Sequence, residues 1–94
     1  MYEKEAVEIM TRWLSHKNEL GKKPAKIKAS GTFTYDDNDY VILKFKPDLL
    51  AKWQVGVVGF DADGDECGHT FSEYEEYDEA TAKDKCIAII EYMK

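Results

Sequence analysis

The chain has 94 residues, 44% of them hydrophobic and 34% charged, with 13 basic and 19 acidic side chains and a net charge of −6. This length fits one domain, residues 1–94, with a single core. The composition excludes a disordered chain, and no apolar run approaches the ~20 residues that a membrane span requires. The charged amino terminus does not resemble a signal peptide, so we expect a cytoplasmic protein.

The charge is distributed unevenly along the sequence. Residues 1–60 carry ten basic and eight acidic residues (+2), whereas residues 61–84 carry one lysine and ten acids (−9). The last ten residues add +1 and restore the total. Because polyanions are repelled by such a surface, bare nucleic acid is not the partner that this charge favours.

The first predicted elements are a helix and two strands. The helix covers residues 3–20, where apolar side chains recur at helical spacing, and Gly21 favours its end. Residues 26–35 and 40–46 alternate apolar and polar side chains, which is typical of strands. The helical apolar residues are Ala6, Ile9, Met10 and Trp13.

The loop between these strands sets their register. If odd-numbered residues of both strands face the core, Phe33 lies near Leu43, and the loop has an odd number of residues. We therefore expect a three-residue hairpin loop at 37–39. The following segment, 47–51, is compatible with one helical turn or with a loose connection.

Two further strands and a second helix complete the chain. Strands at 53–61 and 65–74 flank the dipeptide Asp63-Gly64, which predicts a two-residue turn. Asp78 is typical of a helix N-cap and precedes an amphipathic helix. The apolar stripe of this helix is Ala82, Cys86, Ile89, Ile90 and Met93.

The order α-β-β-β-β-α predicts an α+β protein of two layers, a four-stranded antiparallel meander with both helices packed on one face. The predicted register gives both faces of the sheet apolar residues. A bare face is usually an interaction surface, so Trp53, Val55 and Val57 predict a sheet-face interface for a homodimer or another partner. Alternatively, a bulge at Gly56 or Gly59 switches the side-chain parity and removes the second apolar face.

An acidic and aromatic region follows the third strand. It is either a solvated surface or a docking surface for a basic protein, and we interpret it as the latter. Its aspartate spacing also resembles a calcium loop, but the glycine and glutamate positions of an EF-hand do not match. The predicted partner-binding residues are Asp61, Asp63, Asp65, Glu66, Glu73, Tyr74, Glu75, Glu76 and Tyr77.

Cofactor and enzyme chemistry have little support in the sequence. Cys67, His69 and Cys86 could hold zinc if the second helix covers that strand, but a fourth ligand is not indicated. We interpret the cysteines as small core residues and expect no metal and no cofactor. Arg12 is the one arginine, and no phosphate loop or nucleophile elbow is present, so we expect a protein that is not an enzyme.

A basic patch precedes the first strand. Its lysines either protect an edge strand from unwanted pairing or bind nucleic acid, with Tyr35 and Tyr40 as stacking surfaces. The patch consists of Lys22, Lys23, Lys26 and Lys28.

The second half, Trp53 to Met93, resembles the arm-type DNA-binding domains at the amino termini of phage and transposon tyrosine integrases. The resemblance implies a three-stranded sheet that is backed by a helix and lays its open face in the major groove. The similar features are Trp53, Val55 and Val57 in a strand, the Asp63-Gly64 turn, Phe71 and the helix start Glu79-Ala80. Where that family carries Lys and Arg, this chain has Glu66, Glu73, Glu75 and Glu76, so DNA binding does not carry over.

The sequence therefore predicts a small non-catalytic interaction module that docks a basic partner through residues 61–79. One version is an inhibitor of phage or mobile-element origin that mimics the charge of nucleic acid. The alternative function is a nucleic-acid-binding domain that uses the sheet and the Lys22–Lys28 patch.

Overall fold

A four-stranded antiparallel sheet forms the centre of the computed structural model, which describes residues 2–17, 23–71 and 79–92. Each strand pairs with its sequence neighbours in the order β1-β2-β3-β4. The elements are α1 (Glu3–Lys17), β1 (Lys26–Tyr35), β2 (Asn38–Lys46), β3 (Gln54–Phe60), β4 (Glu66–Phe71) and α2 (Glu79–Tyr92). The predicted α+β class, element order and antiparallel meander are confirmed.

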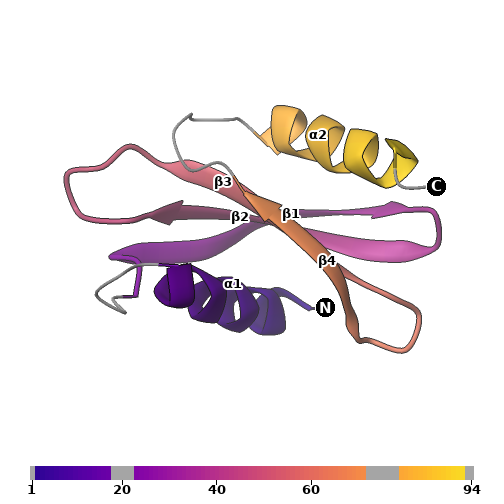
Figure 1. The fold of residues 1–94 in the computed structure, drawn as a ribbon, viewed down its shortest axis with the longest axis horizontal. Helices are drawn as coiled ribbons and strands as arrows, with labels where there is room; N and C mark the ends of the chain where they lie inside the picture. The colour runs from indigo at the N-terminus through magenta and orange to yellow at the C-terminus, as the bar shows by residue number, and fades with distance from the viewer. Residues whose placement is uncertain (1, 18–22, 72–78, 93–94) are drawn as a thin grey trace.

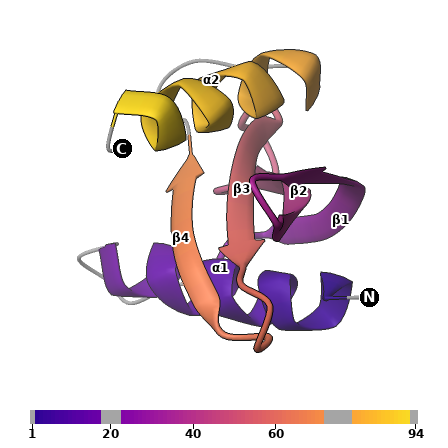
Figure 2. The same ribbon diagram turned by 90° about the vertical axis from the view of Figure 1, so that its right-hand side faces the viewer.

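The two helices cover opposite faces of the sheet (Figures 1 and 2). One core joins α1 to the sheet through Ala6, Met10, Val41, Leu43, Val58 and Phe60. The other joins α2 to the sheet through Tyr40, Ile42, Val55, Val57, Ala82 and Cys86. The molecule thus has three layers, and the predicted two layers with both helices on one face are wrong. Neither of these helices is long and apolar enough to cross a membrane.

Strand geometry explains the two cores. Successive side chains of β2 and β3 point to opposite faces, and both sets are apolar, so each face needs its own cover. Val55 and Val57 are only 2% and 1% exposed beneath α2. The sheet-face interface predicted at Trp53, Val55 and Val57 is therefore interior for both valines. Of the predicted α2 stripe, Ala82 and Cys86 are buried, whereas Ile89 is 45% exposed and Met93 lies outside the described residues.

A β-bulge lets β1 serve both cores. The β1–β2 register shifts between Ala29 and Gly31, so that Ser30 is the extra residue. Ala29 packs with the α1 core, whereas Phe33 packs with the α2 core. The alternation predicted for residues 26–35 is correct in period, but the strand changes the face that its apolar residues cover.

The β1–β2 hairpin has a two-residue loop. Asp36 and Asp37 have φ angles of 53° and 66°. Two positive values are typical of a type I′ turn, which aspartate tolerates. The predicted three-residue loop is wrong, and Phe33 lies opposite Tyr40 rather than Leu43, with the two rings stacked at 4.9 Å.

The β3–β4 hairpin turns over three residues rather than the predicted two. The N–H of Asp61 donates a hydrogen bond to the carbonyl oxygen of Asp65 (2.9 Å). The N–H of Gly64 donates one to the carbonyl oxygen of Asp61 (3.0 Å). Gly64 takes a left-handed φ of 83°. A bulge at Cys67, beside Gly59, recovers the register. Beyond it the predicted pairs are present: Val58 with His69 and Gly56 with Phe71.

The β2–β3 connection is a turn held by Asp48. Its Oδ1 accepts a hydrogen bond from the N–H of Leu50 (2.9 Å), and its carbonyl oxygen accepts one from the N–H of Ala51 (3.2 Å). Leu49 and Leu50 are 68% and 98% exposed on this turn. Segment 47–51 is thus an ordered turn that presents two leucines.

Candidate functional site

The sheet topology gathers acidic residues at one end of the molecule. Antiparallel strands in sequence order place the β1–β2 and β3–β4 turns together, opposite to the β2–β3 connection (Figure 1). Tyr2 stacks on Phe60 at 4.6 Å, so the first turn of α1 also lies at this end. The acidic end consists of Glu3, Glu5, Asp36, Asp37, Asp39, Asp61, Asp63, Asp65 and Glu66.

The acidic end contains part of the predicted partner-binding surface. Asp63, Asp65 and Glu66 are exposed, and Asp61 is half-buried beside them. The remaining predicted residues, 73–77, lie outside the described residues. Sequence reasoning missed the acids of the first hairpin and of α1, although the meander order alone places both hairpin turns at one end.

Asp61 organises the turn at the acidic end. Its Oδ1 accepts hydrogen bonds from the backbone N–H groups of Asp63 and Asp65, both at 3.0 Å. A carboxylate bound to its own loop is a structural cap, so this aspartate spacing has a conformational explanation. Within the described residues, no three His, Cys, Asp or Glu side chains lie together in a way that could hold a metal ion.

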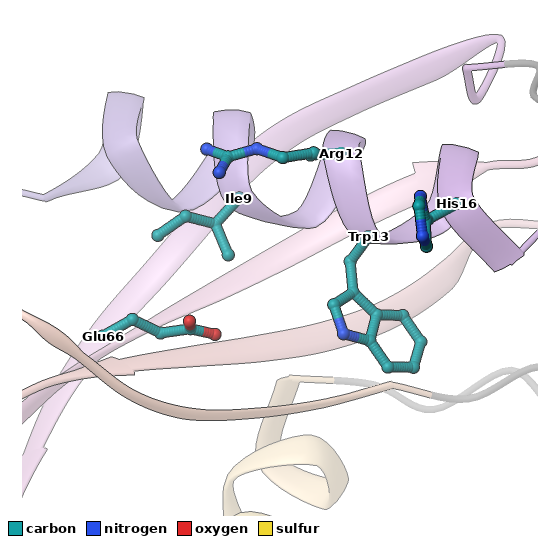
Figure 3. A pocket seen from close by; sticks show the side chains of 5 residues that line it. All are labelled: Ile9, Arg12, Trp13, His16 and Glu66. Carbon is teal, nitrogen blue, oxygen red and sulfur yellow. The ribbon is translucent and has the colours of Figure 1, made fainter.

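A hollow of about 450 Å³ opens between α1 and β4, next to the acidic end. Ile9 and Trp13 form its apolar wall, and Arg12 and His16 add two basic groups from the same helix (Figure 3). Glu66 enters from β4, and its carboxylate points toward the nitrogen-bearing edge of the Trp13 ring (Figure 3). The hollow therefore lies between the aromatic ring of Trp13 and the acidic β3–β4 hairpin.

The sequence pattern assigned Ile9 and Trp13 to the core of the first helix. Both are only half-buried and line the hollow. The fully buried positions of α1 are Ala6 and Met10, each 0% exposed. Helical spacing identifies which side of α1 faces the sheet. It does not predict how deeply the residues at the edges of that side are buried, because their burial depends on how far β4 extends beside the helix.

Lysines gather at the opposite end of the sheet. The β1–β2 register places Lys26 opposite Lys46 and Lys28 opposite Lys44. The Nζ atoms of Lys28 and Lys46 each lie 5.3 Å from the centroid of the Trp53 ring. We define the basic end as Lys23, Lys26, Lys28, Lys44, Lys46, Lys52 and Trp53; one exposed acid, Asp48, lies on the β2–β3 connection at the same end.

The predicted basic patch is only partly correct. Lys23, Lys26 and Lys28 are exposed, and Lys22 lies outside the described residues. Tyr40 is only 4% exposed, so it is not the predicted stacking surface. Tyr35 is half-buried and lies next to the Asp36-Asp37 turn, at the end of the sheet away from these lysines. Trp53 is the aromatic residue beside the lysines. Trp53 directly precedes β3, whose first residue, Gln54, pairs with Phe45 beside Lys44 and Lys46, and this neighbourhood could have identified it.

Cys67, Cys86 and Tyr40 lie near one another between β2, β4 and α2. The Tyr40 ring and the Cys67 sulfur both crowd Gly59. Cys86 is buried as predicted, but Cys67 is exposed, so the prediction that it is a core residue is wrong. Partial desolvation of the Cys67 sulfur still raises the pKa of its thiol, with a further contribution from the Asp61 carboxylate. Burial also raises the pKa of Cys86, to about 11. Both thiols are protonated at neutral pH, which is the opposite of an activated nucleophile. The side chain of His69 lies outside the described residues, and so does the zinc alternative that includes it.

The raised pKa of Cys86 predicts a loss of stability in alkali. The pKa is 9.0 in an ordinary environment and about 11 in the folded chain, so above pH 9 the unfolded state loses this proton first. The free energy of unfolding therefore falls between about pH 9 and 11, by about 1 to 2 kcal/mol from this group. Urea unfolding of the wild type and of Cys86→Ala between about pH 9 and 11 measures this loss of stability. Parallel profiles for the two proteins would contradict the assignment.

The fold and the site define a small three-layer α+β protein with an acidic end, a basic end and a hollow beside the acidic hairpin. Comparison with protein-family models, curated proteins and solved structures finds no match for this chain. The resemblance of residues 53–93 to integrase domains stays a prediction.

Proposed function

We propose that this chain is a cytoplasmic, non-catalytic interaction module that docks a basic protein segment at its acidic end. One observation carries the proposal: the acidic β3–β4 hairpin continues through Glu66 into the wall of the hollow that Ile9 and Trp13 line. A surface with charge alone steers a partner, whereas an aromatic pocket within it supplies affinity.

The hollow suits an arginine or lysine side chain. A cation over the face of Trp13 gains a cation–π interaction, and its aliphatic stem can pack on Ile9. Glu66 then supplies a charge-assisted hydrogen bond. Arg12 and His16 line the same hollow, so it takes one basic side chain, and the other cations of a bound segment lie over the carboxylates of the acidic end.

A specific version of this function is an inhibitor that mimics nucleic acid, of the kind that phages and mobile elements encode. Carboxylates from two hairpins and from α1 lie at one end, where they can oppose the lysines and arginines of a nucleic-acid-binding protein. Such a mimic acts by occupying the partner's basic surface, and it needs no catalytic group of its own.

The experiment is a calorimetric titration of the chain with the peptide (Arg-Ser)₄ at low salt. We expect Glu66→Gln to weaken binding about tenfold, because a charge-assisted contact inside the hollow is lost. Trp13→Leu should weaken it by a similar factor. The matched control is Asp84→Asn, which removes one exposed charge from α2. Equal affinities for Glu66→Gln and Asp84→Asn would mean that only net charge attracts the peptide.

A further inference from the structure

The basic end carries a grid of four lysines on one face of the sheet. Lys26 pairs with Lys46, and Lys28 pairs with Lys44. Neighbouring strands lie about 5 Å apart, and alternate residues along a strand lie about 7 Å apart, so the grid is compact. Like charges placed directly opposite one another destabilise a sheet. The negative charges of a bound polyanion would offset this repulsion between the lysines.

An aromatic ring lies beside this grid. Trp53 is half-buried, and the ammonium groups of Lys28 and Lys46 lie over its ring, each 5.3 Å from the ring centroid. An open hollow of about 570 Å³ lies along it, lined by Pro24, Ala25, Lys26, Ile27, Lys28 and Trp53. An aromatic ring among several ammonium groups is the combination that binds a base and its flanking phosphates. Here the ammonium groups of Lys28 and Lys46 would leave the ring for the phosphates as the base stacks.

We propose that the basic end binds single-stranded nucleic acid, with phosphates on the lysine grid and one base in the hollow against Trp53. A single strand fits better than a duplex, because an unpaired base exposes the face that stacks on the ring. This site lies at the opposite end of the sheet from the acidic end and is separate from the proposed protein-docking surface. The net charge of −6 opposes binding, so the affinity is highest at low salt.

The test is fluorescence anisotropy of labelled dT₁₂ with the full chain, at salt concentrations from 20 to 200 mM. Four lysine contacts predict a slope of about −3 for the logarithm of affinity against that of salt. Lys28→Gln combined with Lys46→Gln should reduce the slope by about 1.4 and weaken binding at least about tenfold at 20 mM. The matched control, Lys4→Gln with Lys85→Gln, removes the same charge outside the basic end and should change affinity by less than about twofold.

The aromatic contact has its own test. Trp53→Leu should weaken dT₁₂ binding about tenfold while leaving the salt slope unchanged, because stacking is lost and no phosphate contact is. Trp53→Phe keeps an aromatic face and should recover most of the affinity. Circular dichroism confirms that each variant is folded before binding is compared.

Four results would overturn the proposal. The first is the absence of salt-dependent binding at 20 mM. The second is an equal loss of affinity in the two double lysine variants. The third is unchanged affinity in folded Trp53→Leu. The fourth is equal affinity for an oligoglutamate peptide or for a duplex of the same length, which would point to a general polyanion surface.

Discussion

Val57→Asp should abolish or severely weaken folding of this chain. Val57 is 1% exposed between the sheet and α2, and a carboxylate there has no basic partner among the residues of that core. Burying an unpaired charge costs about 3 to 5 kcal/mol, a large part of the total stability of a small domain. Thermal unfolding followed by circular dichroism measures the loss.

The matched control for Val57→Asp is Leu50→Asp, at a side chain that is 98% exposed. We expect no loss of stability there, because the new carboxylate stays in water. Val57→Thr, which keeps the shape of valine, gives a measurable intermediate loss of about 1 to 2 kcal/mol if Val57→Asp does not fold. A Val57→Asp protein as stable as the wild type would mean that this sheet face is open.

Gly59→Ala should destabilise the fold by about 2 to 3 kcal/mol, or about 10 °C or more in Tm. A Cβ atom at this position would lie 2.5 Å from Tyr40 Cε1 and 3.1 Å from Cys67 Sγ. Tyr40 cannot move aside easily, because its ring stacks on Phe33 at 4.9 Å. The added methyl group therefore forces the α2 core apart.

Gly31→Ala is the control for this substitution. The nearest atom to a Cβ at Gly31 is Ile42 Cδ1 at 3.9 Å, which is ordinary contact. We expect an unchanged or slightly raised Tm, because alanine also restricts the unfolded chain. Equal effects of the two substitutions in calorimetry would argue against the packing of Tyr40 over Gly59.

Local periodicity was sufficient to predict the elements of this fold. The first helix and strand β1 fall where spacing of apolar residues predicts them, with β1 beginning and ending at the expected Lys26 and Tyr35. The spacing of apolar residues depends only on neighbours within one helix or strand, so it can be recognised in the sequence alone. The α+β class and the meander follow from their order.

Hairpin loop lengths could not be predicted in this way. Asp36 and Asp37 both adopt positive φ, and the Asp61 carboxylate binds the backbone of its own loop. Each detail changes the loop by one residue, and a one-residue slip sends side chains to the other face. The bulge at Ser30 has the same consequence. These local contacts set the hairpin registers, whereas the apolar residues on both faces of β2 and β3 require a helix on each face.

Those residues of the candidate site that lie close together in the sequence could be predicted from it. Asp63, Asp65 and Glu66 lie close together on one hairpin, whereas Glu66 and Trp13 line one hollow only because the fold places β4 beside α1. The lysine grid likewise could not be predicted without the β1–β2 register, which places Lys26 opposite Lys46. Contacts between distant segments become visible once the register and the layers are known.

The two tryptophans allow a direct test of the central claim, that the acidic hairpin and its hollow dock a basic segment. Trp13 lines that hollow and Trp53 lies at the basic end, so their indole N–H signals report the two ends separately. In ¹H–¹⁵N spectra, titration with (Arg-Ser)₄ should shift the Trp13 indole signal and the amides of residues 61–66, and leave the Trp53 signal in place. A Trp13 signal that stays fixed while other acidic positions shift would contradict docking in the hollow.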